Sequence, residues 1–424
     1  MNILDYLDWR GDLSFDAAQI NEVDALIFAW LSYYRFEDLG AAEKLDGLTL
    51  RELAALHEQL RGPFQKVNLT TTIRPSLTAE WLLYCASLTP RFVGVRVRGF
   101  QSDADRTEGV QFAAVSFGIE GARLVVAYRG TDATINGWKE DFQLSFLEAV
   151  PAQIRAAQYL QDAADGQKTL VCGHSKGGNL AVYAALHASE AQLADIERIY
   201  NFDGPGFCFD TLDQERYARI RERVVTIVPE ASIIGMLLEH DEDYRVVRSQ
   251  MASILQHDAM FWKVLGNHFV YADKLSASSV FADKVLSDWI RGMSLQERKT
   301  FVEAIFGILE STGAETFSEL PERIVQNGFR ALTAAATLDP QQKKMAFRLL
   351  TDLVKAGNAN LYESAALPGA IAETTRSIVE GTGHLAEAVE QKLGAIGARL
   401  PSPQSLMDKL RAAKSEEPPR EDDP

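Results

Sequence analysis

The feature that most constrains the fold is a regular alternation of β-rich and helical segments along residues 92–249. The β-rich segments are short and contain many Val, Ile and aromatic residues, and the segments between them carry apolar residues at helical spacing. The expected strands are 92–100, 110–117, 124–128, 168–172, 198–202, 224–228 and 244–249, and the expected helices are 151–164, 177–189 and 212–222. Strands that alternate with helices in this way form βαβ units. The pattern therefore predicts an α/β fold with a mainly parallel sheet.

Helical segments flank this region on both sides. In the N-terminal part, 1–90, helices are expected at 21–34, 50–60 and 76–88. After residue 280 the strand pattern stops, and helices are expected at 285–308, 322–336, 340–356 and 371–393. We therefore expect a first domain over 1–280, a C-terminal helical region over 281–414, and a charged, proline-rich and disordered tail over 415–424.

Composition excludes several classes of function. The formal net charge of −16 argues against sequence-independent nucleic-acid binding, which needs Lys and Arg to displace counterions. No stretch of about 18 apolar residues predicts a membrane span, and the N-terminus does not resemble a signal peptide. The three cysteines, Cys85, Cys172 and Cys208, are far apart and form no metal-binding motif, so we expect a reducing, cytoplasmic location with no metal and no cofactor.

The pentapeptide Gly-His-Ser-Lys-Gly at residues 173–177 carries the strongest chemical signal. It matches G-x-S-x-G and lies between an expected strand and an expected helix. In the α/β-hydrolase fold this context places a serine on a sharp turn with its hydroxyl exposed. The motif therefore predicts the α/β-hydrolase fold, with Ser175 as nucleophile.

A second segment lies where this fold places its other oxyanion donor, at the end of a strand before the nucleophile. It reads Tyr-Arg-Gly-Thr at 128–131 and is followed by Trp-Lys-Glu-Asp at 138–141. Together these segments resemble the signature of class 3 lipases. The resemblance implies that the backbone N–H groups of Thr131 and Lys176 bind the oxyanion, and that Asp141 steadies the Thr131 hydroxyl.

The class 3 lipase resemblance covers about residues 90–260. The whole chain, from Met1 into the C-terminal helices, is also similar to a little-characterised bacterial family of lipase-like hydrolases. The segments that carry this second resemblance are 21–24, 173–179, 203–206 and 256–258. It implies no particular substrate.

A hydrolase triad follows the chain order serine, acid, histidine. His257 follows the last expected strand after a short loop and is the preferred base. His268 is the second choice, and His240 is expected to be a solvated loop residue. Class 3 lipases would place an aspartate after strand 224–228, but Glu230 is the only acid there. Asp203, at the end of the preceding strand, is the competing candidate, and both acids stay open.

Two functions from different classes follow. The first is a serine hydrolase that cleaves a carboxylic ester of a small molecule or lipid through an acyl-enzyme on Ser175. The alternative is a weak or inactive hydrolase-fold scaffold that binds a protein partner through its C-terminal helices. Segment 371–400 is compatible with peripheral membrane contact. A solvated helix is favoured instead, because the segment contains few large apolar residues.

Overall fold

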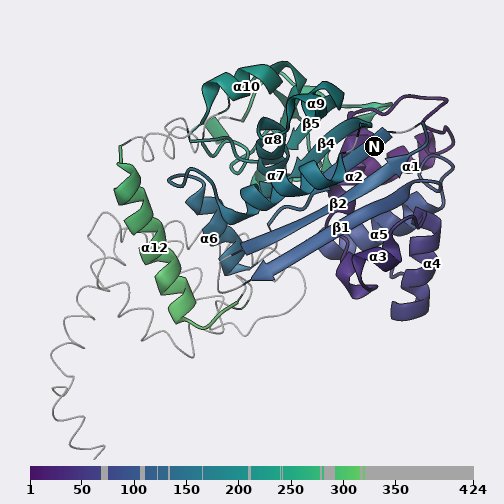
Figure 1. Cartoon of the computed structure of the whole chain (residues 1–424), viewed down its shortest axis with the longest axis horizontal. Coiled ribbons are helices and arrows are strands. Elements are labelled where there is room, and N and C mark those ends of the chain that lie inside the picture. Colours follow the sequence, from purple (N-terminus) through teal and green to yellow (C-terminus); the bar gives the residue numbers. More distant parts are fainter. Residues whose placement is uncertain are drawn as a thin grey trace, which may run out of the picture. The chain divides into compact units, whose positions relative to one another are not determined.

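The computed structural model describes residues 1–67, 75–105, 110–121, 123–131, 134–164, 166–208, 212–238, 240, 242–276, 279–280, 292–315 and 319. These residues all belong to the first of two compact units, Met1–Glu363. Within this unit a central sheet is covered by helices on both faces (Figure 1). The structure thus has the expected α/β fold.

The central sheet has eight strands in the order β1-β2-β3-β4-β5-β6-β7-β10. Neighbouring strands from β3 to β7 are parallel, whereas β1, β2 and β10 run antiparallel to their neighbours. The bounds are β1 Arg96–Asp105, β2 Val110–Ile119, β3 Arg123–Tyr128, β4 Lys168–His174, β5 Ile196–Phe202, β6 Val224–Pro229, β7 Tyr244–Val247 and β10 Tyr271–Ala272. A short hairpin is formed by β8 Val264–Leu265 and β9 His268–Phe269. The mainly parallel sheet is confirmed, and β1 begins later than the predicted strand.

The helices agree with the sequence pattern at most positions. Their bounds are α1 Ile3–Arg10, α2 Glu22–Leu31, α3 Ala42–Leu45, α4 Leu50–Arg61, α5 Pro75–Ser87, α6 Ile135–Gln143, α7 Pro151–Ala163, α8 Lys176–Leu186, α9 Glu190–Asp195, α10 Gln214–Ile220 and α12 Leu295–Ser311. Asn21 caps α2, as predicted, and its side chain accepts from two backbone N–H groups of the first turn. Four short helices, α1, α3, α6 and α9, were not predicted from the sequence, and α6 carries part of the lipase-like signature.

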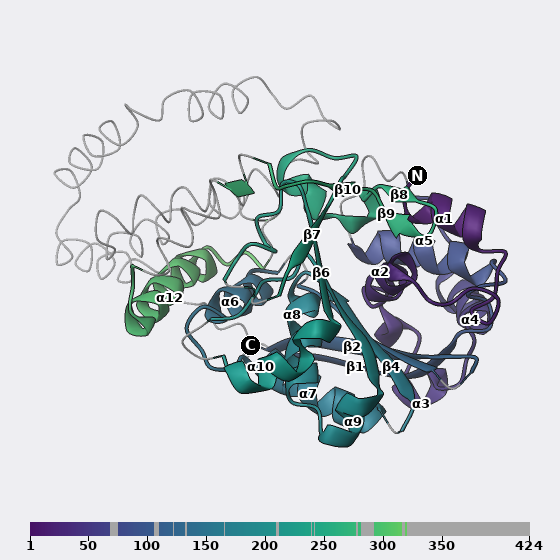
Figure 2. The same cartoon turned by 90° about the horizontal axis from the view of Figure 1, so that it is seen from above.

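The sheet is buried on both faces because alternate residues of each strand point to opposite sides. On β3, Val125 and Ala127 belong to a core shared with α2, α4 and α5, whereas Leu124, Val126 and Tyr128 belong to a core shared with α7 and α8. Figure 2 shows these two groups of helices on opposite sides of the strands. The near-continuous apolar strands are therefore those of a doubly covered sheet.

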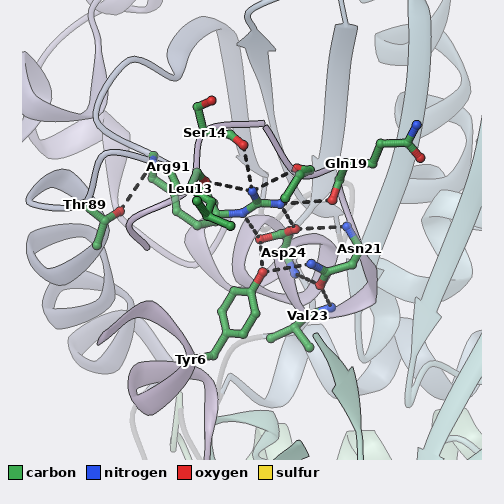
Figure 3. Close-up of polar contacts among 11 residues, drawn as sticks. Tyr6, Leu13, Ser14, Gln19, Asn21, Val23, Asp24, Thr89 and Arg91 are labelled. Carbon is green, nitrogen blue, oxygen red and sulfur yellow. Dashed lines mark hydrogen bonds and ion pairs between the residues drawn. The ribbon is translucent and has the colours of Figure 1, made fainter. Parts of the chain in front are cut away.

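A buried ion pair fixes the N-terminal helices to the start of the sheet. Arg91 donates from Nε and Nη2 to the two carboxylate oxygens of Asp24 at 2.8 and 2.6 Å, and both side chains are completely buried. The remaining guanidinium hydrogens reach backbone carbonyls of residues 13–19, and Tyr6 donates to the same aspartate (Figure 3). Because every charged atom has partners, the N-terminal segment is firmly integrated into the α/β core.

The helix α12 is the described part of the C-terminal region. It packs against α6 through Phe301, Ile305 and Phe306 (Figure 1). The expected helices at 322–336, 340–356 and 371–393 and the tail at 415–424 lie outside the described residues. The predicted domain boundary at residue 280 stays a prediction.

Candidate functional site

Ser175 lies on the sharp turn between β4 and α8. It caps the N-terminus of α8 with φ 57° and ψ −136°, a conformation that few non-glycine residues adopt. Its backbone N–H donates to the carbonyl oxygen of Phe202 at 2.9 Å, and the following helix starts at Lys176. Such strain at a single residue persists only where the surrounding structure imposes it.

Two glycines of the pentapeptide make this turn sterically accessible. A Cβ on Gly173 would lie 2.0 Å from the carbonyl oxygen of Gly177. A Cβ on Gly177 would lie 2.2 Å from the carbonyl oxygen of Tyr128, at the end of β3. Both contacts are with backbone atoms, and a shift of the backbone would disturb the strand or the helix to which it belongs. The glycine pattern in the sequence therefore reflects close packing of the elbow against β3.

His257 and Asp203 form a hydrogen-bonded pair beside this elbow. Nδ1 of His257 and Oδ2 of Asp203 are 2.6 Å apart, and the aspartate side chain is completely buried. His257 ends the short 3-10 helix Ser253–His257, and Asp203 directly follows β5. The ring of His174, the neighbour of Ser175, lies 4.7 Å from that of His257. The structure thus places the His257–Asp203 pair next to the residue that precedes Ser175, at the carboxyl ends of the parallel strands.

The loop after β6 holds the Asp203 carboxylate in place. Ser232 donates its hydroxyl to Oδ1 at 2.5 Å, and the Gly235 N–H donates to the same oxygen at 3.2 Å. Asp203 has φ 50°, a left-handed conformation that aspartate tolerates better than most residues. Since Oδ1 has two donors, Oδ2 is left to the His257 ring. A carboxylate that accepts the Nδ1 hydrogen leaves the lone pair on Nε2 of the imidazole.

The other candidates for the acid and the base make different contacts. The Glu230 N–H donates to Val247, and its carbonyl oxygen accepts from Ser276, so the backbone of Glu230 is directed toward β7. Among the described residues, the His257 ring pairs with Asp203 and not with Glu230. His268 lies exposed in β9, with Nδ1 2.9 Å from the carbonyl oxygen of Phe269.

His240 is not the solvated loop residue that its sequence context predicts. Its side chain is 6% exposed, with Nδ1 3.1 Å from Glu242 and Nε2 2.6 Å from the carbonyl oxygen of Gly235. Burial opposes charge on His240, but the hydrogen bond and charge of Glu242 outweigh it and raise the pKa of the imidazole. Because both ring nitrogens face acceptors, an imidazolium satisfies the site best. Through Gly235, this pair supports the loop that holds Asp203.

The predicted oxyanion segment packs directly on the elbow. A Cβ on Gly130 would lie 2.9 Å from Ser175 Cβ and 2.5 Å from the carbonyl oxygen of His174. Thr131 follows Gly130 at the end of β3. Lys176 is the first residue of α8, where backbone N–H groups have no partner within the helix. The oxyanion segment and the start of α8, which carry the two candidate N–H donors, therefore both adjoin the serine.

Asp141, on α6, holds the Thr131 hydroxyl. Thr131 Oγ1 lies 2.8 and 2.7 Å from the two carboxylate oxygens. Burial raises the pKa of Asp141 to about 7, although nearby Lys176 and the Thr131 hydrogen bond oppose the shift. The Lys176 ammonium is 4.0 Å from this carboxylate and 2.7 Å from Glu140. A buried charge cluster therefore joins the elbow to the helix that supports Thr131.

Comparison with known proteins identifies the family of this chain. The family model of Mbeg1-like proteins matches residues 86–307, just over half of the chain. The chain belongs to the Mbeg1-like family. The matched part of this Mbeg1-like chain contains Ser175, Asp203 and His257.

One solved structure similar to this Mbeg1-like chain is the crystal structure of M37 lipase. The TM-score is 0.33 at 17% identity, and the match covers 51% of this chain and 70% of that chain. A likeness this weak carries no argument about activity. No curated protein matches the chain.

Several side chains at the site of this Mbeg1-like protein were not predicted from sequence. Glu140, Ser232 and Glu242 each hold a predicted or candidate residue, and neither Ser232 nor Glu242 stands in a recognisable motif. The one available signal is that Glu140 belongs to the lipase-like Trp-Lys-Glu-Asp segment. Only their tertiary contacts distinguish these three side chains from ordinary solvent-exposed polar side chains.

The part of the chain that the structure describes contains no group of three or more His, Cys, Asp or Glu side chains arranged to hold a metal ion. None of the helices described there combines the length and the apolar character needed to cross a membrane.

Proposed function

We propose that this member of the Mbeg1-like family is a serine hydrolase that cleaves a carboxylic ester. The observation that carries the proposal is the 2.6 Å pair between His257 Nδ1 and Asp203 Oδ2 beside the positive-φ elbow of Ser175. A strained serine, an imidazole and a buried carboxylate at one edge of a parallel sheet are the parts that acyl transfer requires.

In the proposed first step, Nε2 of His257 takes the Ser175 hydroxyl proton while Oγ attacks the acyl carbon. The carbonyl oxygen becomes an oxyanion, which accepts from the N–H groups of Thr131 and Lys176. The C–O bond of the ester then breaks, and the alkoxide leaves as an alcohol with the proton from His257. Asp203 orients the ring and stabilises the imidazolium that forms between these events.

The second step returns the enzyme to its starting state. Water gives a proton to His257 and attacks the acyl-enzyme carbonyl, and the same N–H groups stabilise the second oxyanion. Collapse of this intermediate releases a carboxylic acid, and Ser175 recovers its proton. No cofactor or metal enters the proposed reaction.

The substrate is proposed only as a class, an acyl ester of a small molecule or a lipid. The scaffold alternative rested partly on the missing aspartate after β6. Asp203, at the end of β5, supplies a carboxylate for His257 instead. The missing aspartate is therefore a weaker argument for the scaffold alternative. Binding of a protein partner by the C-terminal helices remains a hypothesis about residues outside the described part of the chain.

Labelling with a fluorophosphonate probe tests the proposal. Wild-type protein should be labelled at one serine, identified by peptide mass spectrometry as Ser175, and Ser175→Ala should not be labelled. Ser189→Ala, which removes the capping serine at the start of α9, is the matched control and should be labelled like wild type. Absence of labelling in wild type, together with no hydrolysis across p-nitrophenyl esters of several chain lengths, would contradict the proposed function.

A further inference from the structure

A chain of hydrogen bonds links Tyr33, which packs against the oxyanion segment, to the loop that carries His257. It passes through Tyr33, just after α2, and His174, the residue before Ser175. Tyr33 Oη lies 2.9 Å from Nδ1 of His174, and Nε2 of His174 lies 2.8 Å from the carbonyl oxygen of His257. At its other end, the backbone of Gly130 packs against the Tyr33 oxygen. Three segments distant in sequence therefore meet at one phenol and one imidazole.

The direction of each hydrogen bond follows from its partners. A backbone carbonyl can only accept, so Nε2 of His174 must carry a hydrogen. Burial lowers the pKa of His174 well below its ordinary value, and the neighbouring His257 lowers it further, so the ring is neutral. Its Nδ1 then has a lone pair and accepts from Tyr33.

The surroundings leave this chain little freedom. His174 is 2% exposed, and its ring is packed by Trp30 at a centroid distance of 4.9 Å. A Cβ on Gly130 would lie only 2.2 Å from Tyr33 Oη, so the oxyanion segment sits against the phenol. The carbonyl oxygen of His174 is a second, longer acceptor for Tyr33 at 3.3 Å. The phenol and the imidazole thus fill the space between the Gly130 turn and the His257 loop.

We propose that Tyr33 and His174 are positioning residues that set the distance between the oxyanion donors and the His257 ring. The inference rests on the proposed serine hydrolase function. It also explains why the N-terminal helical segment is part of the enzyme, because Tyr33 comes from that segment. Neither side chain supplies a reacting group, although the His174 ring packs against the His257 ring at a centroid distance of 4.7 Å. Each acts by holding the backbone on which a reacting group stands.

The chain offers a matched pair of variants. Tyr33→Phe removes the phenol that bonds to His174, and Tyr34→Phe removes the adjacent phenol, whose oxygen lies 2.8 Å from Nδ1 of His57. Both tyrosines are buried, and the hydroxyl of each bonds to an imidazole. Tyr34 contacts the oxyanion segment through its carbonyl oxygen, which accepts from Arg129 and which Tyr34→Phe leaves in place. A displacement of about 1 Å in a reacting group costs up to about 100-fold in rate, so Tyr33→Phe should lower the fluorophosphonate labelling rate and kcat by about tenfold or more, with little change in KM. Tyr34→Phe should keep its labelling rate and kcat within about twofold of wild type. The two variants should lose a similar amount of thermal stability.

Nitrogen-15 NMR of the histidines provides a readout that does not depend on activity. Wild-type His174 should be the neutral tautomer with hydrogen on Nε2 between pH 5 and 8, and Tyr33→Phe should shift its Nδ1 resonance. Equal labelling rates for wild type and Tyr33→Phe would overturn the inference even if Ser175 is labelled. A hydrogen on Nδ1 of wild-type His174 would overturn it even if Tyr33→Phe failed to fold. Absence of labelling in wild type would instead overturn the proposed function, and the NMR result would still decide the hydrogen-bond chain.

Discussion

Lys176 Nζ lies 2.7 Å from Glu140 Oε2, and both side chains are completely buried. The ammonium also donates to the carbonyl oxygen of Gln111 at 2.9 Å, and the other oxygen of Glu140 accepts from the Ala152 N–H. The pair therefore connects the residue after Ser175 to α6, which carries Asp141.

Lys176→Met should be strongly destabilising because it leaves the Glu140 carboxylate buried without its cation. Removal of one partner of a buried pair costs about 3–5 kcal/mol, and Lys176→Met with Glu140→Gln should recover part of this loss. Urea denaturation measures both free energies of unfolding. The control is Lys139→Met, because Lys139 and Glu310 are also 2.7 Å apart but are 27% and 49% exposed. Loss of that exposed pair should cost less than about 1 kcal/mol, and equal losses at the two lysines would refute the argument.

Asp203→Asn should abolish most hydrolysis, because an amide cannot hold the Nδ1 hydrogen of His257 as a carboxylate does. In a comparable triad the loss in kcat is about 10⁴-fold. Glu230→Gln is the control, since the structure pairs His257 with Asp203, and its kcat should stay near that of wild type. Initial rates on a p-nitrophenyl ester measure both. The reverse ranking would return the role of the acid to Glu230.

Stability should fall as pH rises from about 4 to about 7. Burial raises the pKa of Asp141 and of Asp258 from 3.8 to about 7. Folding therefore favours the protonated acids, so their contribution is fully present below the unfolded pKa and is lost as pH rises through the folded pKa. Each group adds up to about 1.4 kcal/mol per pH unit to the slope. Denaturation curves across this range should show a shallower slope for Asp141→Asn, and an unchanged slope would contradict the assignment.

Gly130→Ala should lose activity because its Cβ would lie 2.2 Å from Tyr33 Oη and 2.5 Å from the carbonyl oxygen of His174. The turn must then move away from the elbow, which displaces Thr131. Gly307→Ala on α12 is the control, since no heavy atom lies within 4 Å of its added Cβ. It should keep the labelling rate and gain up to about 1 kcal/mol from helix propensity. A labelling rate for Gly130→Ala equal to wild type would show that the turn tolerates the displacement.

The sequence predicted elements whose signals are local. Asn21 identified the start of α2 through capping, and the glycines of 173–177 identified the elbow because only glycine fits those two positions. Alternation of strands and helices predicted the parallel sheet. These inferences held because each depends on residues within a few positions of one another.

The choice between Glu230 and Asp203 could not be made in this way. Both residues follow adjacent parallel strands and lie at the same edge of the sheet, so chain order favours neither. The difference arises from the path of the loop after β6, which returns Ser232 and Gly235 to the Asp203 carboxylate. His240 is similar, because Glu242, Tyr217 and Thr226 form its buried network only after three segments pack together.

The sequence by itself therefore determined the α/β class, the serine on its turn and the order of the candidate residues, because periodicity and steric limits act over short stretches of chain. The tertiary structure alone decided which carboxylate meets His257, and that Tyr33 and Lys176 support the site from buried positions. Those contacts join residues far apart in sequence, and their polar groups are stable in the interior only when each finds a partner there.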